Sequence, residues 1–87
     1  MFKRRWIWFG KLRSDEGFDL AYGHRTITYS DHRGAFEFPY EDEFLFPNPR
    51  QVRGAPVQLN AADAKQMTER VLDGIRFDGH RVEIWHK

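Results

Sequence analysis

The stretch "RTITYSDHRGAFEFPY", residues 25–40, decides the fold of this chain. In its first half, Ile27 and Tyr29 alternate with threonines, and such a mixture of β-branched and aromatic residues favours a strand. In its second half, Phe36 and Phe38 fall on one side of an extended chain, with Glu37 on the other. The polar sequence "SDHRG" between the halves is typical of a turn. The pattern therefore predicts a β-hairpin with a five-residue turn.

Shorter alternating runs flank this hairpin on both sides. Phe18, Leu20 and Tyr22 lie on one face of a preceding strand. Pro39 cannot donate to a ladder, so the second hairpin strand ends near it or lies at an edge there. The sequence "FLF" at residues 44–46 predicts a further short strand.

Residues 47–59 contain three prolines and one glycine and have little apolar periodicity, which predicts a loop that crosses the domain. Asn60 then opens the only convincing helix, because its side chain can accept a hydrogen bond from the free amide of Asp63. The helix is expected to end between Asp73 and Phe77, with Gly74 as a cap or a weak interior position. Its apolar stripe recurs every three or four residues and consists of Ala64, Met67, Val71, Leu72 and Ile75. The residues expected to point away from it are Lys65, Gln66, Glu69 and Arg70.

The two ends of the chain both resemble strands. At the C-terminal end, Val82 and Ile84 fall on one face and Trp85 on the other, as in a strand buried on both faces. The opening stretch "KRRWIWFGKLR", residues 3–13, projects Trp6 and Trp8 to one side of an extended chain. Its flanking charges are of the kind that discourage edge pairing with another molecule.

These elements predict an α+β fold, with an antiparallel sheet of about five strands and one amphipathic helix packed on one face. A chain of 87 residues has room for a single domain, residues 1–87. It contains no cysteine, no apolar run long enough for a secretory signal or a membrane span, and a formal net charge of +1. We therefore expect a cytoplasmic protein.

No set of residues has the spacing of a catalytic or metal centre. Contiguous Ser30, Asp31 and His32 cannot form a triad, which is assembled across a fold, and Asp31 is better suited to cap the hairpin turn. The four histidines lack the spacing typical of zinc sites, so solvated turn residues are the preferred interpretation and a metal site the alternative. We therefore expect no catalytic residues, no cofactor and no enzymatic activity.

Two kinds of partner fit the uneven charge distribution. The first is another protein, bound through a charged patch with aromatic anchors, since Trp, Tyr and Arg tend to dominate such interfaces. The acidic residues expected to pair with its basic surface are Glu37, Glu41, Asp42 and Glu43. The second is single-stranded nucleic acid, for which guanidinium groups and exposed rings form a platform. The residues for that role are Lys3, Arg4, Arg5, Trp6, Trp8, Lys11 and Arg13. A homo-oligomer built by edge-strand pairing is a third possibility.

The order of hairpin, "FLF", proline-rich crossing, capped helix and terminal "RVEIW" strand resembles small immunity proteins of bacterial polymorphic toxin systems. One such family carries a G-R-x-I-x-Y-like strand, and "HRTITY" at residues 24–29 is similar to it, with His24 in place of the glycine. The resemblance covers roughly residues 20–86 and implies a non-enzymatic inhibitor that occupies a toxin domain. It assigns no individual binding residue.

Overall fold

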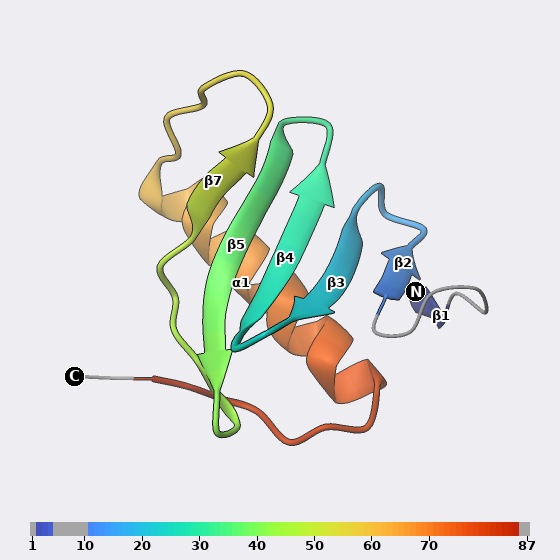
Figure 1. The fold of residues 1–87 in the computed structure, drawn as a ribbon. Helices are drawn as coiled ribbons and strands as arrows, with labels where there is room; N and C mark the ends of the chain where they lie inside the picture. Colours follow the sequence, from blue (N-terminus) through green and yellow to red (C-terminus); the bar gives the residue numbers. More distant parts are fainter. Residues whose placement is uncertain (1, 5–10, 86–87) are drawn as a thin grey trace.

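A computed structural model describes residues 2–4 and 11–85 of the chain. This part forms eight β-strands and one α-helix (Figure 1). The strands are β1 (Phe2–Arg4), β2 (Lys11–Ser14), β3 (Asp19–Gly23), β4 (Thr26–Asp31), β5 (Gly34–Glu41), β6 (Phe44–Leu45), β7 (Arg50–Arg53) and β8 (Glu83–Ile84). The helix, α1, spans Ala61–Phe77. The predicted α+β class is confirmed.

The predicted hairpin forms the centre of the sheet as β4 and β5. Its turn is shorter than the predicted five residues, because Asp31 and Gly34 are already cross-strand partners and only His32 and Arg33 lie between them. Gly34 has a φ of +130°, a conformation that residues with a side chain rarely adopt. The Arg33 backbone N–H donates to Asp31 Oδ1 at 2.8 Å, so Asp31 caps the turn as expected.

The alternation of the strands separates a core face from an open face. Ile27, Tyr29, Phe36 and Phe38 are all fully buried on the face that α1 covers. Figure 1 shows the helix crossing behind β3, β4 and β5. On the open face, Thr28 is the cross-strand neighbour of Ala21 in β3 and of Glu37 in β5.

The helix begins as predicted, since Asn60 Oδ1 accepts from the Asp63 backbone N–H at 2.8 Å. It ends at Phe77, the last residue of the predicted interval, and Asp78 is the C-terminal cap. Gly74 is therefore a buried interior position and not the cap, because the helix continues for three residues beyond it. The residues of α1 buried against the sheet are Met67, Thr68, Val71, Leu72, Gly74 and Ile75.

The sheet is larger than the predicted five strands and is mixed, because one of its described pairings is parallel and the others are antiparallel. The described strands follow the order β1-β2-β3-β4-β5-β6-β8, with β7 also paired to β5. β7 lies inside the segment predicted to be a loop, and its register shifts between Ala35 and Phe36 of β5. β8 pairs with β6 in parallel, because the long connection through α1 returns the chain in the direction of β6.

The chain ends also differ from expectation. β1 and β2 pair as antiparallel strands with Lys3 opposite Arg13, so the opening stretch is not one continuous strand. The prediction for Trp6 to Phe9 lies outside the described residues. At the other end, Val82 is buried but Trp85 is 44% exposed, so the last strand is not buried on both faces.

Candidate protein-binding site

Three of the acidic residues predicted to bind a partner lie at the tight turn that joins β5 to β6: Glu41 is the last residue of β5, and Asp42 and Glu43 form the turn. Asp42 and Glu43 adopt left-handed backbone conformations, with φ of +52° and +68°, and Glu41, Asp42 and Glu43 are all exposed. Glu41 lies 3.6 Å from Arg25 in an exposed ion pair. Within residues 2–4 and 11–85, Asp42 and Glu43 form no ion pair. This turn therefore carries uncompensated negative charge.

Glu37, the fourth predicted acidic residue, lies elsewhere. It occupies the open face in the middle of β5, where Arg50 of β7 is its cross-strand partner. The Arg50 Nη2 atom lies 3.4 Å from Glu37 Oε1. Its charge is thus paired within the chain, and the structure does not bring it together with the turn.

Aromatic residues adjoin the acidic turn on β6 and after β8. The Trp85 ring lies 5.5 Å from the Phe44 ring in an edge arrangement and 5.5 Å from the Phe46 ring at a 31° tilt. The Trp85 backbone N–H donates to the Leu45 carbonyl at 2.9 Å, which fixes the tryptophan beside β6. A pocket of about 470 Å³ opens between Trp85, Phe46, Asn48, Pro39 and Pro47.

A backbone hydrogen bond joins the two features. The Glu83 N–H donates to the Glu43 carbonyl at 2.9 Å, so an additional exposed carboxylate lies next to the turn. Burial, and secondarily the charge of Glu43, raises the pKa of Tyr40 on the neighbouring strand. We call this region the acidic–aromatic surface; it consists of Glu41, Asp42, Glu43, Phe44, Phe46, Glu83 and Trp85.

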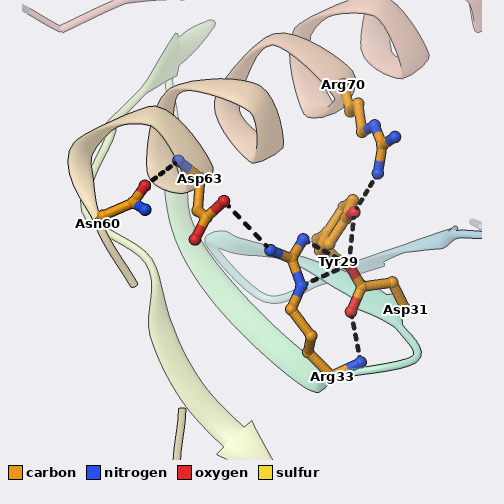
Figure 2. Close-up of polar contacts among 6 residues, drawn as sticks. All are labelled: Tyr29, Asp31, Arg33, Asn60, Asp63 and Arg70. Carbon is orange, nitrogen blue, oxygen red and sulfur yellow. Dashed lines mark hydrogen bonds and ion pairs between the residues drawn. The ribbon is translucent and has the colours of Figure 1, made fainter. Parts of the chain in front are cut away.

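A second polar cluster lies between the β4–β5 turn and α1 (Figure 2). The Tyr29 hydroxyl donates to Asp31 Oδ2 at 2.8 Å and accepts from Arg70 Nη1 at 2.7 Å. Arg33 donates to the same Asp31 oxygen through Nη2 at 2.6 Å and Nε at 3.1 Å. The Arg33 guanidinium also lies 3.8 Å from Asp63 in the first turn of the helix.

The charges of this cluster are stabilised mutually. Burial alone would raise the pKa of Asp31, but the hydrogen bonds from Arg33 and Tyr29 outweigh it and lower that pKa. Burial and the bond to Asp31 raise the pKa of Tyr29. Arg70 also lies over the Phe18 ring, with its Cζ atom 4.8 Å from the ring centroid, so it does not point away from the core as predicted. The cluster connects helix to hairpin, and we assign it to stability.

The residues predicted for nucleic-acid binding are only partly described. Arg13 is exposed on β2 and lies 3.2 Å from Asp19 of β3. Lys3 and Arg4 belong to β1 and Lys11 to β2. Arg5, Trp6 and Trp8 lie outside the described residues.

The open face of the sheet, to which Arg13 belongs, is hollowed. A hollow of about 450 Å³ is lined by Thr28, Ser30 and Arg53, among others. Arg53 forms no ion pair with any other residue that the structure describes. The hollow therefore combines two hydroxyls with one uncompensated cation.

The run Ser30, Asp31 and His32 does not form a triad in the structure. Asp31 bonds to Tyr29 and Arg33, and the adjacent His32 is exposed. In residues 2–4 and 11–85, no three histidine, aspartate or glutamate side chains gather as they would around a metal ion. The same ranges contain no helix with the length and apolar character needed to cross a membrane.

Comparison with known proteins finds no matching family model, no similar curated protein and no similar solved structure. Sequence reasoning identified the acidic turn but missed the partners of Trp85. Phe44 and Phe46 belong to a short apolar run in the sequence. Nothing in that run indicates contact with a tryptophan that follows the helix about forty residues later. Arg70 was missed because its charge suggested the exposed face, although a buried tyrosine such as Tyr29 calls for a polar partner.

Proposed function

We propose that this chain is a small, non-enzymatic protein-binding module whose interface is the acidic–aromatic surface. The observation that carries the proposal is Trp85, which is 44% exposed while it contacts the rings of Phe44 and Phe46. An indole held at the surface by its neighbours can be buried by a partner with little loss of side-chain freedom. Tryptophan is also among the residues that most often dominate binding energy at protein interfaces.

The charges around the tryptophan specify the chemistry of the partner. Asp42, Glu43 and Glu83 are exposed carboxylates without an internal cation among the described residues. A partner with a basic surface would be steered toward them and held in register. An arginine or lysine of that partner can lie over the Trp85 face, where a cation is attracted to the ring. The resemblance to immunity proteins makes a bacterial toxin domain with a basic surface the specific partner that we propose.

The test uses the protein encoded beside this chain in its native genome. If that protein arrests growth when expressed alone, co-expression of this chain should restore growth. The neighbouring protein should keep its full length, because inhibition by binding leaves it intact whereas cleavage would shorten it. Titration calorimetry with the purified pair should then give a dissociation constant that rises with salt. A pair that does not associate at low salt would refute the proposal for that partner.

A matched pair of variants tests the surface itself. Trp85→Ala should weaken binding by about 30-fold, since a central hot-spot residue contributes about 2 kcal/mol or more. Phe77→Ala is the control, because Phe77 is 45% exposed at the end of α1 and does not belong to the acidic–aromatic surface. Its affinity should stay within about threefold of wild type. Equal affinity of wild type and Trp85→Ala would refute the assignment.

A second candidate function, binding of single-stranded nucleic acid, is favoured by the open face of the sheet. Arg53 is uncompensated beside the hollow, and Lys3 is the cross-strand partner of Arg13 on the same sheet. Phosphate groups would contact these cations, and affinity would fall steeply with salt. The test is to titrate the protein with a single-stranded oligonucleotide at low and at high salt and to monitor binding by tryptophan emission. Absence of binding at low salt would refute nucleic-acid binding.

A further inference from the structure

A second groove lies next to the acidic–aromatic surface, between β8 and the first turns of α1. It has a volume of about 420 Å³ and is lined by Pro47, Ala61, Ala64, Thr68 and Ile84, among others. The helix contributes the small side chains of Ala61, Ala64 and Thr68 on successive turns, and Lys65 and Glu69 complete its lining. Pro47 lines both this groove and the pocket at Trp85, so the groove is adjacent to that pocket.

The backbone of β8 presents an open edge at this groove. The Glu83 N–H donates to the carbonyl of Glu43, just before β6, and the Trp85 N–H donates to the carbonyl of Leu45 in β6, at 2.9 Å each. Successive residues of a strand direct their backbone groups to opposite edges, so the N–H and C=O of Ile84 point away from β6. β8 has no second neighbour among the described strands. Ile84 thus offers one donor and one acceptor to an incoming chain.

We propose that an extended segment of the protein partner adds to the sheet at β8, pairing with the backbone of Ile84 and placing one apolar side chain in the groove against Ala61 and Ala64. The open edge favours an extended segment over a helix. The backbone N–H and C=O groups in the interior of a helix are bonded to each other, so they cannot pair with the backbone of Ile84. The adjacent carboxylate of Glu83 favours a basic residue next to the apolar one. The inference rests on the proposed function and specifies how the partner approaches.

The position of the groove explains how a single segment could reach both sites. Ile84 and Trp85 are consecutive, and their side chains line different pockets, Ile84 the groove and Trp85 the aromatic pocket. A segment paired beside β8 would therefore direct alternate side chains toward the groove and away from it. The predicted recognition pattern is an apolar residue flanked by lysine or arginine.

The first experiment needs no natural partner. A phage-displayed library of random linear peptides is selected on the immobilised protein, and the enriched peptides are synthesised. Ala61→Phe narrows the groove, and Ala62→Phe is the matched control, because Ala62 is an exposed neighbour that does not line it. We expect peptides with an apolar residue flanked by basic ones, and at least about tenfold weaker binding to Ala61→Phe only. Enrichment of no peptide, or equal binding to both variants, overturns the proposal.

Amide hydrogen exchange supplies a second readout at the strand edge. The Ile84 amide should exchange rapidly in the free protein and slow by at least about tenfold with the selected peptide, because a backbone hydrogen bond then protects it. The Trp85 amide, already bonded to Leu45, should change little. Unchanged exchange at Ile84 in the presence of a bound peptide overturns the strand-addition geometry.

Binding measurements with the natural partner distinguish failure of the strand-addition proposal from failure of the proposed function. If Trp85→Ala loses binding while Ala61→Phe and Ala62→Phe bind as wild type, the acidic–aromatic surface stands and the groove is refuted. If Trp85→Ala binds normally, the proposed function itself fails. Light scattering over a dilution series completes the test: a dimer that Ala61→Phe dissociates would make a second copy the occupant and would also overturn the proposal.

Discussion

Replacement of Tyr29 by phenylalanine should destabilise the fold through two lost hydrogen bonds and no lost packing. The Tyr29 hydroxyl donates to Asp31 and accepts from Arg70, and its ring is fully buried. Phenylalanine keeps the ring, so no cavity forms. Hydrogen bonds to charged groups contribute about 1.5–3 kcal/mol each.

The expected loss of stability is smaller than the sum of these two hydrogen-bond contributions. Asp31 retains its bonds to Arg33, and Arg70 is only partly buried and can be rehydrated. We therefore expect a loss of about 2–3 kcal/mol in the free energy of unfolding, roughly a 30- to 150-fold change in the folding equilibrium. Urea unfolding at neutral pH, followed by circular dichroism, measures it from the shift in midpoint at constant slope.

The control is Tyr40→Phe, because the Tyr40 hydroxyl forms no hydrogen bond with the other described residues. This variant should lie within about 0.5 kcal/mol of wild type. A double-mutant cycle of Tyr29→Phe with Arg70→Met should give a coupling energy of about 1 kcal/mol, since each single change removes the same bond. A Tyr29→Phe protein as stable as the Tyr40→Phe control would refute this reasoning.

Three further predictions concern the β4–β5 turn and the cap of α1. The pKa of Asp31 is lowered in the folded state, so the stabilising contribution of this carboxylate is present above about pH 4 and is lost as the pH falls through the lowered pKa. Asp31→Asn should therefore be less stable than wild type at pH 7, and the difference between their urea midpoints should narrow toward pH 2. Gly34→Ala should lower the melting temperature sharply, because φ is +130° and the new Cβ would meet the Arg53 carbonyl, whereas Gly17→Ala, at φ +92° in open space, should cost less. Asn60→Ala should cost about 1 kcal/mol in urea unfolding by removing the helix cap.

The parts of the fold that the sequence predicts are those with local patterns. The β4–β5 hairpin was evident from its alternation, and α1 from its apolar stripe and the cap at Asn60. β7 has only one apolar residue, Val52, and becomes a strand because β5 offers it a partner. β6 and β8 are each two residues long, too short for any periodicity, and their parallel pairing depends on the path of the whole chain.

The same distinction applies to the candidate site. The consecutive acidic residues indicate the charged turn, since charge can be read from the sequence without knowledge of the fold. The aromatic half was not predictable, because Trp85 meets Phe44 and Phe46 only through the pairing of β6 with β8. The Arg70 contact depends likewise on where Tyr29 lies beneath the helix.

The parallel pairing of β6 with β8 also has a consequence for biosynthesis. During synthesis, the β4–β5 hairpin and α1 are made before the residues from Val82 onward. At that stage Phe44 and Phe46 lack Trp85, and Ile84 has no strand to extend. A polypeptide that ends before Trp85 would therefore lack the complete acidic–aromatic surface, so the proposed recognition would require synthesis to have passed Trp85.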